Sequence, residues 1–230
     1  PPIHLSPNEK GTLYIGAQFL FRTRDHGASW DRISPDLTTN NPELQRQEES
    51  GGITVDNSAA EMHTTIYAIS ESPKDGKVIW VGTDDGLIHV TADNGVTWKD
   101  VTPPAVGPWA KVSVMDAGRF SPLTAYAAIN TLRLDDLRPH IFRTHDGGKT
   151  WTEIVNGIPN GETVNAVRED PRRKGLLFAG TERAVYVSFD DGANWQSLRL
   201  NMAASSVRDL MVKDDDLVAH RRQRLAGGLG

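Results

Sequence analysis

The chain has 230 residues, 38% of them hydrophobic and 24% charged, with a formal net charge of -5. This composition is that of a globular protein, and a charge spread along the chain without a basic block argues against a nucleic-acid-binding surface. The absence of cysteine excludes disulfides and thiolate metal sites, and no apolar run approaches the length of a membrane span. The chain begins Pro1-Pro2 without a signal segment, so we expect a piece of a longer or processed protein.

In chain order, short β-branched or aromatic runs recur around four copies of one turn-like pattern. Each copy has two runs before it and one after it, and a further run opens each set. Four strands in each repeat are typical of a β-propeller blade. The runs before the copies are 13–15 and 19–22, 78–81 and 87–90, and 176–179 and 184–187; those after are 30–33, 98–101, 151–155 and 195–198; the opening runs are 64–70, 111–115, 163–169 and 207–212.

The repeated pattern itself is Ser/Thr-x-Asp-x-Gly-x-Thr/Ser/Asn-Trp, which lies between the third and fourth strand of each expected blade. Its Asp can accept hydrogen bonds from the turn, its Gly suits a positive φ, and its Trp can be buried between strands. Because four equivalent copies indicate scaffold, we interpret these residues as structural. They are Asp25, Gly27 and Trp30; Asp93, Gly95 and Trp98; Asp146, Gly148 and Trp151; and Asp190, Gly192 and Trp195.

The pattern therefore predicts an all-β fold, a β-propeller of about four and a half blades over residues 1–219. About four and a half blades suggest a sector of a larger propeller, although self-association could also cover the end blades. Loops account for the uneven spacing of the copies, and they fall at 36–63, 102–110 and 130–140. The expected blades are 1–35, 62–102, 110–156, 162–200 and a partial blade 205–219, followed by a disordered tail at 220–230.

With Asp, Gly and Trp at fixed positions, the four copies resemble Asp boxes, also called BNR repeats. Such repeats occur in sialidases, xyloglucan-degrading glycoside hydrolases, sortilin-type receptors and photosystem assembly factors. Long phrases, such as ESPKDGKVIWVGTDDGLIHVTADNGVTWKDVTPP, are similar to bacterial glycosyl hydrolase or sortilin-like BNR propeller proteins. The resemblance implies that the boxes face away from the functional end of the blades, and it implies a secreted or periplasmic location.

On that implied functional end, the loops carry the candidate site residues. Asp84 and Asp135 are the candidate catalytic carboxylates, and solvated turn residues are the alternative interpretation of both. A retaining glycosidase needs two carboxylates about 5 to 5.5 Å apart and an inverting one about 6.5 to 9.5 Å. The candidate ligand-binding residues are Asp85, Trp109, Asp136, Glu182 and Arg183, with Glu61 as a further carboxylate. Trp109 could instead pack between blades.

Other kinds of site find less support in the sequence. A sialidase needs an arginine triad and a tyrosine paired with a glutamate, and no such pair is evident. The seven histidines show no paired ligand spacing, so we expect no metal site, and no phosphate-binding glycine loop indicates a cofactor.

The function is therefore open between different classes. The first hypothesis is a binding or assembly module that presents a loop-rich face to a glycan, peptide or protein partner. The second is part of a glycoside hydrolase, xyloglucanase-like rather than sialidase-like. A structural fragment without its own function is the third. Neither nucleic acid nor membrane insertion is expected.

Overall fold

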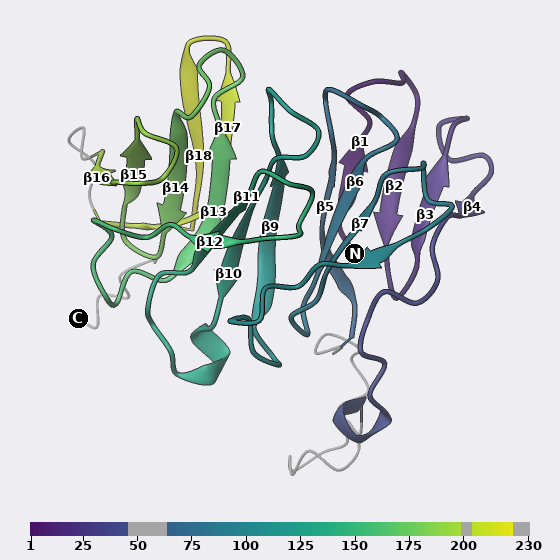
Figure 1. The fold of residues 1–230 in the computed structure, drawn as a ribbon, viewed down its shortest axis with the longest axis horizontal. Helices are drawn as coiled ribbons and strands as arrows, with labels where there is room; N and C mark the ends of the chain where they lie inside the picture. The colour runs from purple at the N-terminus through teal and green to yellow at the C-terminus, as the bar shows by residue number, and fades with distance from the viewer. Residues whose placement is uncertain (46–63, 199–203, 223–230) are drawn as a thin grey trace, which may run out of the picture. The chain divides into compact units, whose positions relative to one another are not determined.

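The computed structural model describes residues 1–45, 64–198 and 204–222. Two segments lie outside the described residues: 46–63, which belongs to the loop expected at 36–63 and includes Glu61, and 223–230 of the tail. The chain divides into two compact units, Pro1–Val112 and Ser113–Gly230, and each is described by itself. In the described residues every regular element is a strand or a short 3-10 helix (Figure 1).

Unit 1 contains two four-stranded antiparallel sheets, each a meander of consecutive strands. A short 3-10 helix, η1 (Pro42–Gln45), follows the first of them. Blade 1 consists of β1 (Ile3–Leu5), β2 (Leu13–Gly16), β3 (Leu20–Thr23) and β4 (Asp31–Arg32), and blade 2 of β5 (Ile66–Glu71), β6 (Ile79–Thr83), β7 (Ile88–Thr91) and β8 (Lys99–Asp100).

Unit 2 contains two more four-stranded meanders and a two-stranded sheet. Blade 3 consists of β9 (Lys111–Ala117), β10 (Ala125–Asn130), β11 (Ile141–Thr144) and β12 (Thr152–Glu153), with the 3-10 helix η3 (Leu132–Leu134) after β10. Blade 4 consists of β13 (Val164–Glu169), β14 (Leu177–Thr181), β15 (Val185–Ser188) and β16 (Gln196–Ser197). Partial blade 5 consists of β17 (Ser206–Lys213) and β18 (Asp216–Arg222). The first residues of β9 belong to unit 1.

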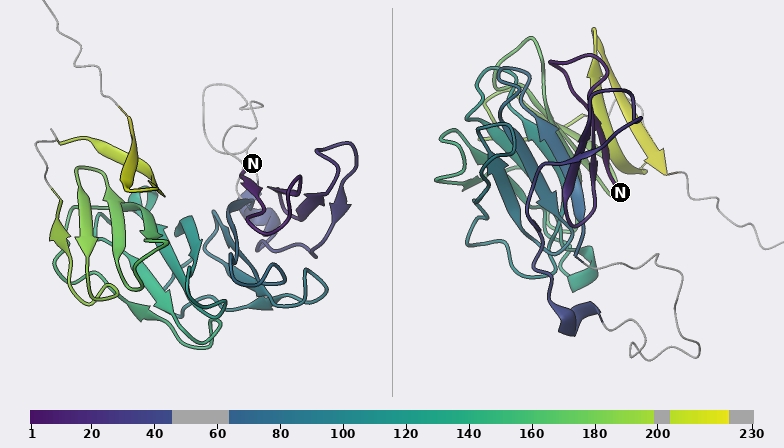
Figure 2. Two further views of the ribbon diagram at one scale, coloured as in Figure 1. Left: turned by 90° about the horizontal axis from the view of Figure 1, so that it is seen from above. Right: turned by 90° about the vertical axis from the view of Figure 1, so that its right-hand side faces the viewer.

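The core of unit 2 forms because the first strand of each blade packs against the blade before it. β13 packs against β10, and β17 packs against β13 and β14, so the β17–β18 hairpin lies beside blade 4 (Figures 1 and 2). The β-branched residues Val164 and Val207, which open these first strands, are completely buried. Apolar burial of this kind is the main force that holds neighbouring blades together.

A β-bulge interrupts three of the first strands just after that buried residue. The register of β5 shifts around Tyr67 in unit 1, and the registers of β13 and β17 shift around Asn165 and Arg208 in unit 2. A bulge leaves one residue unpaired and re-aims its side chain, which is why bulges are common beside functional sites. Each of these side chains lies near the end of its blade that carries the loop between the second and third strands.

The sequence placed most strands within a few residues of their observed positions. The fourth strands are only two residues long, shorter than the expected runs. β18 extends to Arg222, past the expected end of the ordered chain at residue 219. The expected fold class agrees with the structure, because the sheets are antiparallel meanders with the Asp box between the third and fourth strands.

Candidate functional site

Each Asp box closes its hairpin through the carboxylate of its Asp. In blade 2, Asp93 Oδ1 accepts hydrogen bonds from Thr91 Oγ1 at 2.7 Å and from the backbone N–H of Thr97 at 2.8 Å, while Oδ2 accepts from Thr97 Oγ1 at 2.5 Å. Thr91 Oγ1 in turn accepts the N–H of Gly95 at 3.0 Å. The side chains of Thr91, Asp93 and Thr97 are therefore bonded to one another and to the backbone within the turn.

The other three boxes repeat this arrangement. Asp25, Asp146 and Asp190 accept the same set of hydrogen bonds, with Ser29, Thr150 and Asn194 at the position of Thr97. The box glycine has a positive φ in each copy, and at Gly192 a β-carbon would also lie only 2.3 Å from Ile154 Cδ1. These contacts leave no box carboxylate directed at a ligand.

Acid should destabilise both units through these carboxylates. Hydrogen bonds from the Thr97 and Thr150 side chains, then from the backbone, lower the pKa of Asp93 and Asp146 to about 2, and equivalent bonds lower the pKa of Asp25 and Asp190. Because an unfolded Asp titrates near about 3.9, this stabilisation is complete above that pH and is lost as the pH falls through the folded pKa. The melting temperature should therefore decrease as the pH is lowered from about 4 to about 2. Asp→Asn changes in the boxes should make the melting temperature depend less on pH over this range. An unchanged slope in a variant with all four changes would contradict the assignment.

The box tryptophans differ in burial. The Trp195 indole is buried, and its Nε1 donates to the carbonyl of Ile154 at 2.8 Å, at the end of the preceding blade. Trp98 Nε1 makes the equivalent bond to Ile33 at 2.9 Å. Trp30 is exposed, because blade 1 has no preceding blade in the described residues. Trp151 is intermediate in exposure.

Asp84 and Asp85 are not the solvated turn residues that the sequence suggested. Both side chains are buried. Asp84 Oδ1 accepts the backbone N–H of Thr65 at 2.8 Å. Asp85 Oδ2 accepts the N–H and the hydroxyl of Thr39 at 2.8 and 2.7 Å, and its Oδ1 accepts the hydroxyl of Thr83. Buried and bonded in this way, the two carboxylates tie loops of unit 1 to blade 2.

In unit 2, a polar cluster gathers where two of the bulges lie. Glu182, in the loop between β14 and β15, accepts from Asn165 Nδ2 at 3.0 Å and pairs with Arg208 Nη1 at 2.9 Å. Asn165 Oδ1 accepts from Asn130 Nδ2 at 2.8 Å, and Asn165 Nδ2 also donates to the carbonyl of Val207. We call Asn130, Asn165, Glu182 and Arg208 the bulge cluster. Its amides are buried, whereas its ion pair is partly open to solvent.

The remaining predicted residues take separate positions. Arg183 follows Glu182 and is exposed. Asp135 is exposed at the end of η3, in the loop that starts at Asn130, and has a left-handed backbone with φ of 56°. Asp136 in the same loop is held by Arg138 through bonds of 2.9 and 2.7 Å, which hold the pKa of Asp136 well below its usual range. Trp109 lies in unit 1, half-buried, with φ of 66°.

Sequence reasoning found Glu182 but missed its partners Asn130, Asn165 and Arg208. A β-bulge has no simple sequence signal, and the four residues come from three blades. In β13 and β17 the residue at the bulge is polar and follows a buried valine, but two such dipeptides are too short a pattern to indicate a site.

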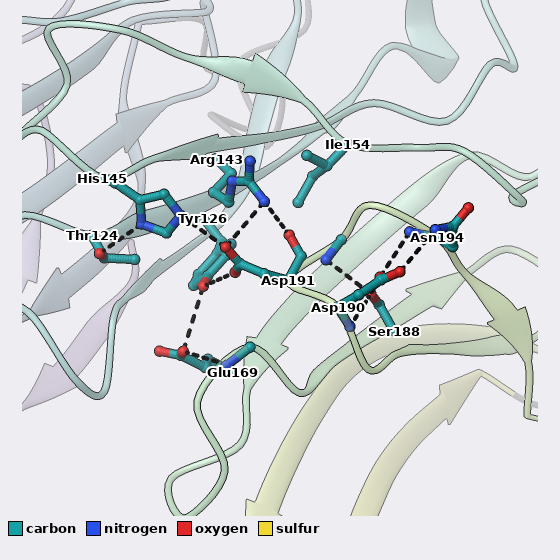
Figure 3. A network of polar contacts seen from close by, with 12 residues as sticks. Thr124, Tyr126, Arg143, His145, Ile154, Glu169, Ser188, Asp190, Asp191 and Asn194 are labelled. Atoms are coloured by element: carbon teal, nitrogen blue, oxygen red, sulfur yellow. Dashed lines mark hydrogen bonds and ion pairs between the residues drawn. The ribbon is translucent and has the colours of Figure 1, made fainter.

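The structure also brings together two tyrosine–glutamate pairs that the sequence did not reveal. Tyr126 Oη lies 3.4 Å from Glu169 Oε1 and donates to Asp191 Oδ1 at 2.7 Å (Figure 3). In unit 1, Tyr14 takes the equivalent place beside Glu71; burial and then the Glu71 charge raise the pKa of Tyr14 above its ordinary value. Tyr126 and Glu169 are only 1% and 3% exposed, so this pair is not placed to attack a substrate.

No group of three or more His, Asp or Glu side chains in the described ranges is arranged to hold a metal ion. No helix there has the length and apolar character needed to cross a membrane.

Comparison with known proteins supports this picture of the scaffold. The family model described as BNR/Asp-box repeat matches residues 142–153, which span the third box. A xyloglucanase from Paenibacillus sp is 25% identical over 214 residues, an alignment that covers 68% of this chain and 21% of that protein. The chain thus spans about a fifth of the length of this curated relative.

Solved structures are similar in fold. The GH74 xyloglucanase from Xanthomonas campestris has a TM-score of 0.65 at 20% identity, covering 92% of this chain and 33% of its own. The β-propeller domain of Cps50 from Myceliophteria thermophila also has a TM-score of 0.65, at 11% identity, covering 95% of this chain and 61% of its own. The chain therefore contains an Asp-box (BNR) repeat and has a β-propeller fold, and it is similar to a xyloglucanase.

Proposed function

We propose that this chain is a substrate-binding part of a glycoside hydrolase-like propeller protein, and that its ligand is a neutral polysaccharide of the xyloglucan class. The observation that carries the proposal is the bulge cluster at the loop end of unit 2. The similarity to the Paenibacillus xyloglucanase supports the choice of ligand.

The chemistry of the bulge cluster suits sugar hydroxyl groups. A carboxylate accepts, a guanidinium donates up to five hydrogen bonds in a planar fork, and an amide does both. Arg208 uses part of that capacity on Glu182 and Asn165, and its side chain is 36% exposed. The buried amides of Asn130 and Asn165 fix the cluster from behind, which reduces the entropy lost when a ligand binds.

The engagement of four of the predicted carboxylates argues against a catalytic role for them. Asp84 and Asp85 are buried in backbone hydrogen bonds, Glu182 is paired with Arg208 and Asp136 with Arg138. A general acid needs a proton at neutral pH and a nucleophile needs access to the sugar, and neither requirement fits these contacts.

Affinity electrophoresis or calorimetry with xyloglucan tests the proposal. We expect Arg208→Ala to weaken binding by about tenfold or more, because a hydrogen bond to a charged group contributes about 1.5–3 kcal/mol. Arg172→Ala is the matched control, since Arg172 pairs with the exposed Asp215 at the box end of the same unit. Equal binding by both variants at equal stability would contradict the assignment.

A hydrolysis assay separates the two roles. Under the proposal, the purified chain shows no xyloglucan hydrolysis that depends on Asp84 or Asp135. Robust xyloglucan hydrolysis by the purified chain that either change abolishes would instead establish a catalytic site here.

A further inference from the structure

In the part of the chain that the structure describes, the network around Tyr126 contains three carboxylates, and one of them has no cationic side chain paired with it. Asp116 is paired with Arg119 at 3.2 Å and lies 3.7 Å from Arg168. Asp191 is paired with Arg143 at 3.0 Å and with His145 at 2.8 Å (Figure 3). Among the described residues, no Lys, Arg or His side-chain nitrogen lies within ion-pair distance of Glu169.

Glu169 is bonded instead by neutral groups. The backbone N–H of Arg119 donates to Oε2 at 2.6 Å, and that of Gly175 donates to Oε1 at 3.3 Å. Its own N–H donates to Asp116 at 2.8 Å, which brings a second carboxylate close. An isolated carboxylate in such a buried place is costly as an anion.

Hydrogen counting at Tyr126 points the same way. A phenol carries one hydrogen, and Tyr126 Oη contacts two carboxylates, Asp191 at 2.7 Å and Glu169 at 3.4 Å. The hydrogen serves the shorter contact, so Glu169 faces a lone pair of the phenol oxygen. Two acceptors facing each other in a buried site are satisfied only when one of them gains a proton.

We propose that Glu169 is a proton-binding site that stabilises the contact between blades 3 and 4 in mild acid. In the protonated form, the Glu169 carboxyl donates to Tyr126 Oη, which donates to Asp191. Burial, outweighing the two backbone hydrogen bonds, raises the pKa of Glu169, and the charges of Asp116 and Asp191 raise it further.

Blades 1 and 2 provide an internal comparison. There Tyr14 lies beside Glu71, but the box residue that faces the preceding blade is Asn94, whose Oδ1 accepts from Arg22 Nη1 at 2.6 Å. Glu71 also accepts from the side chains of Ser6 at 3.0 Å and Asn8 at 2.5 Å. Here, in the described part of the chain, the phenol has no second carboxylate beside it, so its hydrogen is not drawn away from Glu71 as the hydrogen of Tyr126 is from Glu169.

The direction of the pH effect follows from linkage. A carboxyl whose folded pKa is raised binds its proton more tightly in the folded state, so stability increases as the pH falls through that pKa. The gain is complete near about pH 4.3, where the unfolded Glu titrates, above the range in which the box aspartates lose their contribution. The groups that face Glu169 are Asp116 on β9, the Arg119 backbone after it, Tyr126 on β10 and Asp191 in the fourth box, with Arg143 on β11 and His145 in the third box behind Asp191.

Thermal unfolding between about pH 7.5 and about pH 5 tests the proposal. We expect the melting temperature of the wild type to rise relative to Glu169→Gln as the pH falls. Asp191→Asn, which copies Asn94, frees the phenol hydrogen for Glu169 and should move the rise to lower pH. Asp215→Asn, at an exposed carboxylate, should leave the wild-type profile unchanged.

Infrared difference spectra provide a readout that needs no stability comparison. Over this pH range the wild type should gain a larger carbonyl band of protonated carboxyl groups than Glu169→Gln, and the difference between the two should correspond to one carboxyl group. Parallel melting profiles for wild type and Glu169→Gln, or equal bands in the two folded proteins at about pH 5, would overturn the proposal.

Discussion

Replacing Trp195 with alanine is expected to cost about 3–5 kcal/mol of the unfolding free energy, the usual range for a large buried aromatic side chain. Trp195 is 4% exposed and packs in the main core of unit 2. Its loss removes that packing and also leaves the carbonyl of Ile154 without the bond from Nε1. Urea denaturation followed by circular dichroism measures the change.

The first box supplies the control for this prediction. Trp30 occupies the same motif position but is 39% exposed. We expect Trp30→Ala to cost less than about 1 kcal/mol, as for most exposed positions. Trp195→Phe should fall between the two, because it keeps most of the burial and loses only the hydrogen bond. Equal costs at Trp30 and Trp195 would show that the motif, rather than burial, sets the contribution.

Replacing Asp85 with alanine should destabilise unit 1 by about 3 kcal/mol, because a buried carboxylate is lost and three donors, one of them on the fully buried Thr83, lose a charged acceptor. Those donors are the N–H and hydroxyl of Thr39 and the hydroxyl of Thr83. Asp75→Ala is the matched control, since Asp75 is exposed and accepts one bond, from the N–H of Lys77 at 3.0 Å. Thermal and urea unfolding of the two variants should differ clearly.

This second prediction also separates structure from catalysis. If Asp85 acted on a ligand, the alanine variant would keep its stability and lose binding or turnover. The buried position of Asp85 predicts the opposite result: the alanine variant loses stability, and any loss of binding or turnover follows from unfolding.

The box turns are the part of the scaffold that sequence reasoning could describe in detail. Every polar partner of Asp93 lies within four residues of it, so the contact depends only on local geometry. The strands were also readable, because β-branched runs separated by turn residues indicate strands at any position in a fold.

The site residues were less readable because their contacts are distant in sequence. Tyr126 and Glu169 are 43 residues apart, and Asp85 meets Thr39 across 46 residues. The sequence gives Asp84-Asp85-Gly86 the composition of a solvated turn, and the packing of a loop over it made its carboxylates buried. The bulges at Asn165 and Arg208 are shifts in pairing register, which composition alone does not reveal.

The sequence by itself therefore determined the blade count, the repeated box and the fold class, because these depend on local hydrogen bonds and on the alternation of apolar residues. Only the tertiary structure decided which carboxylates are buried and which of the box tryptophans is buried. It also decided that four distant residues come into contact: Asn130, Asn165, Glu182 and Arg208. Burial and pairing depend on which blade lies beside which, and that information lies in packing between segments rather than within any one of them.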